Sequence, residues 1–352
     1  MLAVIRLWSP ELIRDAWLGH NDFVPSYIAG KLASSGQLYS AAETVRLQES
    51  LLGIRADWML YMRPPFFAVL MKPLAALPFA MAYAIFQTLS VISIGVFVWL
   101  FARNSLEVAI LSSISIPILF AVLQGQDIGF VMLAFAGFYF LSLRGKSFAS
   151  GLALSLCLIK FHLFPLTGLA LLMRREWGVV RGVATGALAL AALSFAVVGG
   201  NWPALYWQAL KNPALHPGEK GMPNLHGLVT LMGWNGITEG LLMAAVIVVF
   251  LFAVIGGASR PLTFSLALTG GLLLSYHAYV QDGMMLLGAL GILGMTEGLT
   301  LFRRLLQVSL IPLPYALLAA QNVWSAALTL LIAAAFLAGV SERASTQVDT
   351  SM

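Results

Sequence analysis

From residue 64 onward the sequence is a series of apolar runs separated by short polar connections, and this pattern limits the fold more than any other feature. A straight helix needs about 20 apolar residues to cross a bilayer, and several of the runs are shorter than that. The expected fold is an all-α, polytopic membrane bundle with about 11 membrane helices, some of them broken or re-entrant. The expected helices lie near residues 79–101, 108–123, 128–143, 148–159, 163–173, 183–199, 237–255, 262–276, 283–301, 305–319 and 323–340.

The composition supports a membrane protein and excludes other classes. Only 10% of the residues are charged and 60% are hydrophobic, whereas charged residues make up about a quarter of a soluble domain. A net charge of +5 would suggest nucleic acid in a soluble chain. Here the lysines and arginines stand in short connections, where they set the topology, so nucleic-acid binding is not expected. Cys157 is the single cysteine, so no intrachain disulfide or cysteine-based zinc framework is possible.

Three regions follow from the order of the runs. Residues 1–63 are expected to form an extracytoplasmic N-terminal loop, residues 64–340 the membrane bundle, and residues 341–352 a cytoplasmic tail. The segment 64–78 is apolar but bracketed by prolines, which predicts a re-entrant or interfacial helix. Charged residues and a proline interrupt the first 18 residues, so neither a signal peptide nor a membrane helix is expected there.

The basic residues of the short connections predict the orientation. A continuous helix over residues 147–173 would be about 40 Å long, and its two flanking basic clusters would lie on opposite sides of the membrane. A turn at Lys160 keeps both clusters cytoplasmic. The same threading gathers the remaining polar groups on the extracytoplasmic side: Asp22, Gln124, Gln126, Asp127, Lys160, His162, His277, Gln281 and Asp282.

Several motifs of the first half occur in a characteristic order. They are Asn21-Asp22-Phe23, Tyr27, residues 36–39, Pro64-Pro65-Phe66, Gly125-Gln126 and residues 151–160. Together they resemble family 87 of the glycosyltransferases, membrane enzymes of the GT-C superfamily that include polyprenyl-phosphomannose-dependent mannosyltransferases. Members normally carry a membrane helix before the aspartate loop, and the first twenty residues here depart from that pattern.

The resemblance implies an activity and its partners. The chain would transfer a hexose, with mannose as the expected sugar, from a polyprenyl-phosphate donor to a lipid-linked or glycan acceptor. The reaction would take place on the extracytoplasmic side of a bacterial inner membrane, among membrane lipids. No nucleotide or other cofactor is implied. The sequence shows no HExxH, DxD or paired-cysteine signature, so a metal requirement is unsupported.

Asp22 is the expected catalytic residue. In the family, a carboxylate of the first external loop is the general base that deprotonates the acceptor hydroxyl, and Asp22 occupies that position. A positioned base contributes about 10² to 10⁴-fold to a rate. The alternative is that Asp22 caps a helix that begins near Val24, since aspartate is a favoured N-cap. Both roles are compatible.

The candidate donor-binding residues are polar groups at the ends of apolar runs. Lys160 is costly at membrane depth unless it meets an anion or water, so the donor phosphate is its expected partner, with a snorkelling lysine as the alternative. His277, with Asp282 nearby, would contact the phosphate or sugar hydroxyls, unless this segment is an interfacial belt. His162 would join them or serve as a structural hydrogen-bonding group.

Two further candidates have stronger structural alternatives. Arg63 stands where the family more often has an aromatic residue; it would bind phosphate through two hydrogen bonds or lie solvated at the interface. Gln126 lies beside Asp127, which is read as the residue that begins the next helix. Two other functions stay open: a transporter or flippase for a lipid-linked sugar, and an inactive scaffold homologue. A transporter would show a second interrupted helix pair in the C-terminal half, and the sequence shows none.

Overall fold

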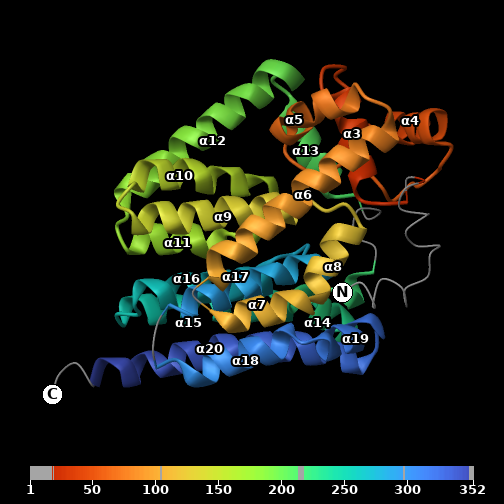
Figure 1. Cartoon of the computed structure of the whole chain (residues 1–352). Helices are drawn as coiled ribbons and strands as arrows, with labels where there is room; N and C mark the ends of the chain where they lie inside the picture. The colour runs from red at the N-terminus through yellow and green to blue at the C-terminus, as the bar shows by residue number, and fades with distance from the viewer. Residues whose placement is uncertain (1–17, 19, 104, 213–217, 296–297, 349–352) are drawn as a thin grey trace.

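The computed structural model describes residues 18, 20–103, 105–212, 218–295 and 298–348, with side chains described up to residue 342. The first part of the expected N-terminal loop and the end of the expected tail lie outside these residues. The described chain is all helical and contains no strand, which confirms the predicted fold class. The helices α9, α11, α16, α17 and α20 run along one common direction, while α3, α4 and α13 lie at one end of the bundle (Figure 1).

The elements of the first half are α3 (Phe23–Leu32), α4 (Ala41–Leu52), α5 (Pro65–Ala75), α6 (Phe79–Ala102), α7 (Leu106–Ser113), α8 (Ile116–Leu123), α9 (Ile128–Leu143), α10 (Ser147–Ser155), the 3₁₀ segment η1 (Leu156–Leu163), α11 (Pro165–Met173) and α12 (Trp177–Val198). The second half contains α13 (Trp202–Leu210), η3 (Glu219–Gly221), α14 (Leu225–Met232), α15 (Gly236–Ile255), α16 (Arg260–Leu274), η4 (Val280–Gly283), α17 (Met284–Leu293), α18 (Thr300–Leu310), α19 (Pro312–Ala319), η5 (Val323–Ser325) and α20 (Ala326–Val348).

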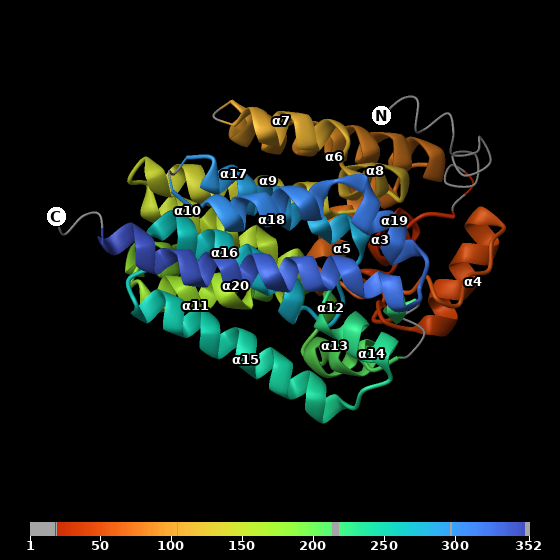
Figure 2. The same ribbon diagram turned by 90° about the horizontal axis from the view of Figure 1, so that it is seen from below.

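Several of these helices are long and apolar enough to cross a bilayer. Four meet that test among the described residues, and six do so if the bent pairs α7–α8 and α18–α19 each count as one span. Five shorter apolar helices accompany them. Figure 2 shows α15, which is largely exposed, along an outer edge of the bundle. The chain is thus a polytopic helical membrane protein, and the count of about 11 membrane helices stays a prediction.

Most predicted helices are present, with shifted ends, but those expected as single helices over 108–123 and 305–319 are broken: α7 and α8 meet at 51°, and α18 and α19 at 54°. The helix expected over 283–301 is wrong at its C-terminal end, because α17 stops at Leu293 and α18 begins at Thr300. Gly294 follows α17, and Gly298 has a φ of 90° that favours glycine and does not continue a helix. The amphipathic helix α4 and the short helices α13 and α14 lie in segments that were expected to be loops.

The predicted turn at Lys160 is confirmed. Lys160 has φ −125° and ψ 53°, which breaks the helical path inside η1. Ser142, before this stretch, and Glu176, after it, both contact the guanidinium of Arg260, at 2.6 Å and 2.9 Å. The chain therefore leaves one end of the bundle at Ser142 and returns to the same end at Glu176. Lys160 lies between them, toward the opposite end.

Small residues bring α10 and α12 into close contact. Gly178, Gly182 and Gly186 recur every fourth residue on α12 and face Gly151 and the serines of α10. A Cβ atom on Gly182 would lie 2.2 Å from the carbonyl oxygen of Phe148, so only glycine fits there. Close backbone approach at small residues is a common way for membrane helices to associate. This contact fixes the half-helix that leads to Lys160.

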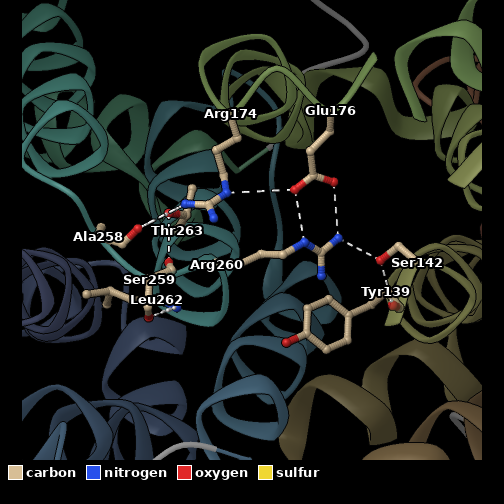
Figure 3. Close-up of polar contacts among 9 residues, drawn as sticks. All are labelled: Tyr139, Ser142, Arg174, Glu176, Ala258, Ser259, Arg260, Leu262 and Thr263. Carbon is tan, nitrogen blue, oxygen red and sulfur yellow. Dashed lines mark hydrogen bonds and ion pairs between the residues drawn. The ribbon is translucent and has the colours of Figure 1, made fainter. Parts of the chain in front are cut away.

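A polar cluster ties several helix ends together, and Figure 3 shows it. Arg260, at the start of α16, makes a two-point ion pair with Glu176 at 2.9 and 3.2 Å. The guanidinium of Arg174 donates to the carbonyl oxygen of Ala258 at 3.0 Å. Ser142 lies 15 residues beyond Asp127, which is about 22 Å along a helix. The cluster is therefore a structural tie at the end of the bundle opposite Asp127.

Candidate active site

A cavity of about 410 Å³ opens at the end of the bundle that holds Asp127. Its volume falls within the range of small-molecule sites, roughly 300–1,000 Å³. It gathers six of the seven residues proposed from the sequence: Asp22, Arg63, Gln126, Lys160, His277 and Asp282. These residues come from segments far apart along the chain. His162 is the seventh and does not line the cavity.

Asp22 is held at the cavity by contacts with the turn between α8 and α9. Its backbone N–H donates to the carbonyl oxygen of Gln124 at 2.8 Å, and the side-chain amide of Gln126 donates to its carboxylate. Gly125 forms the turn with a φ of 66°, and a Cβ atom there would lie 3.0 Å from the Tyr83 ring and 3.2 Å from Phe23. Glycine is therefore required where the two segments meet.

Asp22 precedes α3, but its carboxylate makes no capping hydrogen bond. Asn21 does so instead, because its Oδ1 accepts from the backbone N–H of Phe23 at 2.9 Å. The alternative role of Asp22 as a side-chain cap is therefore wrong. The carboxylate remains available to the cavity, where the residue is exposed.

The surroundings of Asp22 shift its titration. The protein that lines the cavity replaces part of the water around it, and this burial raises the pKa of the Asp22 carboxyl above its usual range. The hydrogen bond from Gln126 and the positive charges of Lys160 and Arg63 oppose that rise in pKa without cancelling it. A carboxylate with a raised pKa is a stronger base than an ordinary one.

Asp127 also lines the cavity, and sequence reasoning missed its contacts there. It precedes α9, as expected, but its side chain makes no capping hydrogen bond. It accepts instead from Nε and Nη2 of Arg63, at 2.5 and 3.2 Å, and lies 3.4 Å from Nζ of Lys160. Burial alone would raise the pKa of Asp127, but the charges of Arg63 and Lys160 lower that pKa to about 2. One signal in the sequence could have identified this role of Asp127: Arg63 and Lys160 are cations that need carboxylate partners in an apolar protein.

Arg63 is not the solvated arginine that the alternative supposed. Its side chain is only 14% exposed and lies against Asp127. Three tyrosines hold the backbone around it: Tyr39 donates to the carbonyl oxygen of Arg63 at 2.9 Å, Tyr61 to that of Pro64 at 2.8 Å, and Tyr206 to that of Met62 at 3.3 Å. The guanidinium therefore rests on a fixed stretch of backbone.

Lys160 is buried and does not snorkel toward an interface. Its Nζ lies 2.6 Å from Asp282 and 3.4 Å from Asp127. Asp282 also accepts from the backbone N–H of Tyr279 at 2.9 Å, so it holds the segment after α16 in place. The break in η1 puts an ammonium between two carboxylates at the cavity wall.

The two histidines differ in their positions. His277 lines the cavity, and its ring lies 4.7 Å from that of Tyr279. His162 contacts Oγ of Ser275 through Nδ1 at 2.8 Å, and the same Oγ accepts from the backbone N–H of His277 at 3.2 Å. His162 thus supports the segment that carries His277, which agrees with its structural alternative.

The geometry combines one exposed carboxylate with two buried cations in one chamber. A sequence model of glycosyltransferase family 87 matches residues 61–280, more than half of the chain. The chain belongs to glycosyltransferase family 87. Searches of the curated proteins and of the solved structures found no match. The family match includes Arg63, Asp127 and Lys160, whereas Asp22 and Asp282 lie outside it.

Membership of glycosyltransferase family 87 and the apolar helices make this chain a membrane glycosyltransferase. Among the described residues, no three histidine, cysteine, aspartate or glutamate side chains are grouped so that they could hold a metal ion. The absence of a cofactor stays a prediction.

Proposed function

We propose that this family 87 glycosyltransferase transfers a hexose from a polyprenyl-phosphate donor to a hydroxyl of a lipid-linked or glycan acceptor. Mannose is the proposed sugar, the reaction is placed on the extracytoplasmic side of a bacterial inner membrane, and the enzyme uses the GT-C architecture. One observation supports the proposal above all. The exposed carboxylate of Asp22 and the cations of Arg63 and Lys160 line the same cavity.

Each step of the reaction has a residue to perform it. Asp22 takes the proton of the acceptor hydroxyl while the hydroxyl oxygen forms a bond to C1 of the donor sugar. The bond between C1 and the phosphate oxygen breaks, and its electron pair leaves with the polyprenyl phosphate. A single base and a direct displacement invert the configuration at C1. Arg63, Lys160 and His277 stabilise the charge that develops on the departing phosphate.

The two cations retain donors for that phosphate. Nε and Nη2 of Arg63 contact Asp127, and within the described part of the chain its Nη1 meets no acceptor. Lys160 has two carboxylate partners for three N–H groups. Charge-assisted hydrogen bonds of this kind are about twice as strong as neutral ones. Stabilisation of developing charge by such fixed donors is usually the largest catalytic contribution.

The test is sugar transfer by the purified protein. Radiolabelled polyprenyl-phosphate mannose and polyprenyl-phosphate glucose are incubated with the protein and membrane lipids, and labelled glycolipid or glycan is measured. Asp22→Asn is expected to lower the rate by about 10² to 10⁴-fold. Transfer by the variant at the wild-type rate would remove Asp22 from the mechanism. Movement of labelled donor across the vesicle membrane without sugar transfer would favour a transporter. The absence of both movement and transfer would favour a scaffold.

Single-cysteine labelling tests the proposed side. Cys157 is buried, so the native thiol gives little background. Ser50→Cys, at an exposed position of α4 and at the same end of the bundle as α3, should react with an impermeant maleimide in intact cells. Arg144→Cys, at the opposite end, should react only after permeabilisation. The reverse pattern would place the cavity on the cytoplasmic side.

A further inference from the structure

Asp127 contacts both cations of the cavity. Its carboxylate bridges Arg63, through two hydrogen bonds of 2.5 and 3.2 Å, and Lys160, at 3.4 Å. Its side chain is 6% exposed, so water screens these contacts little. Asp282 differs, because it pairs with Lys160 at 2.6 Å and otherwise binds the backbone of Tyr279. Among the described residues, Asp127 alone is paired with both cations.

The site of Asp127 in the fold is rigid. It stands between the Gly125 turn and α9, whose first residues Ile128 and Gly129 are buried against the bundle. A Cβ atom on Gly129 would lie 2.9 Å from the side chain of Ile94 on α6, so α9 and α6 are in close contact here. The carboxylate is therefore a fixed reference point for the longer side chains that reach it.

The contacts of Asp127 determine which N–H groups remain. The N–H groups of Nε and Nη2 of Arg63 both donate to the one carboxylate, which fixes the plane of the guanidinium. Its Nη1 is then directed away from that carboxylate. The same carboxylate restrains the ammonium of Lys160. Without it, both flexible side chains would gain rotamers and would have to be ordered again when a donor binds.

We propose that Asp127 is a positioning residue, which orients Arg63 and Lys160 so that their remaining N–H donors face the phosphate of the glycosyl donor. This inference rests on the proposed function. It assigns Asp127 no contact with substrate. Its effect is carried by the two cations.

A positioning role predicts a particular kinetic pattern. Asp127→Asn keeps the size of the side chain but removes its charge, which otherwise repels the phosphate. The loss of this repulsion favours binding of the phosphate, whereas the cost of ordering the two cations again opposes it. The affinity for non-reacting polyprenyl phosphate should therefore change by less than about threefold. The value of kcat should fall by at least about tenfold, because a well-placed hydrogen bond between charged groups is worth more than that factor. Asp57→Asn is the matched control, since Asp57 pairs with Arg55 at 3.5 Å on the exposed surface.

A double-mutant cycle separates positioning from a structural role. In an Arg63→Gln background, Asp127→Asn should lower kcat by a much smaller factor than it does in the wild type, because the guanidinium that Asp127 orients is already absent. Arg63→Lys provides a second arm that keeps all charges. Lysine cannot make the two-point contact, so kcat should again fall by about tenfold. This arm remains informative even if Asp127→Asn fails to fold.

The outcomes are distinct. Wild-type kcat in Asp127→Asn or in Arg63→Lys would overturn the inference, as would independent effects in the double variant. A melting temperature lowered without any change in kcat would also overturn it, because the residue would then be structural. Wild-type protein that neither transfers sugar nor binds polyprenyl phosphate would overturn the proposed function instead.

Discussion

The contact between α10 and α12 allows a direct test of how the bundle positions Lys160. The perturbation is Gly182→Ala on α12. Its added Cβ atom would lie 2.2 Å from the carbonyl oxygen of Phe148 and 2.9 Å from the Cα atom of Gly151. Both neighbours are backbone atoms, so no side-chain rotation can relieve the overlap. The two helices must move apart, by about 1 Å, before the contact becomes an ordinary one.

Two opposing effects set the magnitude. Overpacking costs typically about 1–3 kcal/mol, whereas alanine is favoured over glycine inside a helix by about 1 kcal/mol. Because the overlapping atoms belong to the backbone, the overpacking cost is expected near the top of its range, which leaves a net loss of up to about 2 kcal/mol in the free energy of unfolding. Gly95→Ala on α6 is the matched control, because nothing lies within 4 Å of its added Cβ atom. That control should match or exceed the wild type in stability.

The assay is thermal unfolding of the purified protein in detergent, followed by tryptophan fluorescence, together with sugar transfer. Gly182→Ala should melt below the wild type and should also transfer sugar more slowly, because α10 leads into the segment that holds Lys160. A melting temperature equal to that of Gly95→Ala would refute the reasoning. It would mean that the helices separate without cost.

Four further predictions concern charge. Because burial raises the pKa of Asp22, which must be ionised to act as a base, kcat/KM should rise with pH through a value above the ordinary 3.8. Gln126→Leu removes a hydrogen bond that lowers this pKa, so the acid limb should move to higher pH; an unmoved limb would exclude the contact. The pKa of Asp127 is about 2, so its contribution to stability should be complete above pH 3.8 and lost as the pH falls through about 2, in acid unfolding followed by circular dichroism. Glu176→Gln should lower the free energy of unfolding by about 1–3 kcal/mol and leave the KM for the donor unchanged, since the cluster of Arg260 and Glu176 does not line the cavity; a changed KM would contradict this separation.

The fold was predictable where apolar runs are long or end at clear breaks. The start of α9 at Ile128 and the turn at Lys160 agree with the sequence, because a lysine inside an apolar run can be accommodated only at a break or a polar cavity. The end of α17 at Leu293 and the start of α18 at Thr300 were not predictable from hydrophobicity alone, since the positive φ of Gly298 is a matter of glycine geometry. Helix α14 buries five of its eight residues and α4 buries Thr44 and Gln48, contacts that their local sequences do not reveal.

The site was predictable by residue but not by partner. Six of the seven proposed residues line the cavity. The predicted orientation of the helices places the polar ends of several apolar runs on the same side, where they meet at one end of the bundle. The roles of Asp127 and Arg63 depend on a pairing across 64 residues of sequence, and no local pattern encodes it. Likewise, the capping role of Asn21 in place of Asp22 depends on backbone angles at a single residue.

The side chains of the chamber come from positions 22, 63, 127, 160 and 282, so the first and the last lie 260 positions apart in a chain of 352 residues. A ribosome that has made only the first two hundred residues has not yet supplied Asp282, and Lys160 then lacks its nearest counter-ion. In the unfinished chain the ammonium keeps only the 3.4 Å contact with Asp127, a carboxylate that Arg63 also uses. Insertion of the later helices supplies the second carboxylate, Asp282, so assembly of this chamber is completed late in biogenesis.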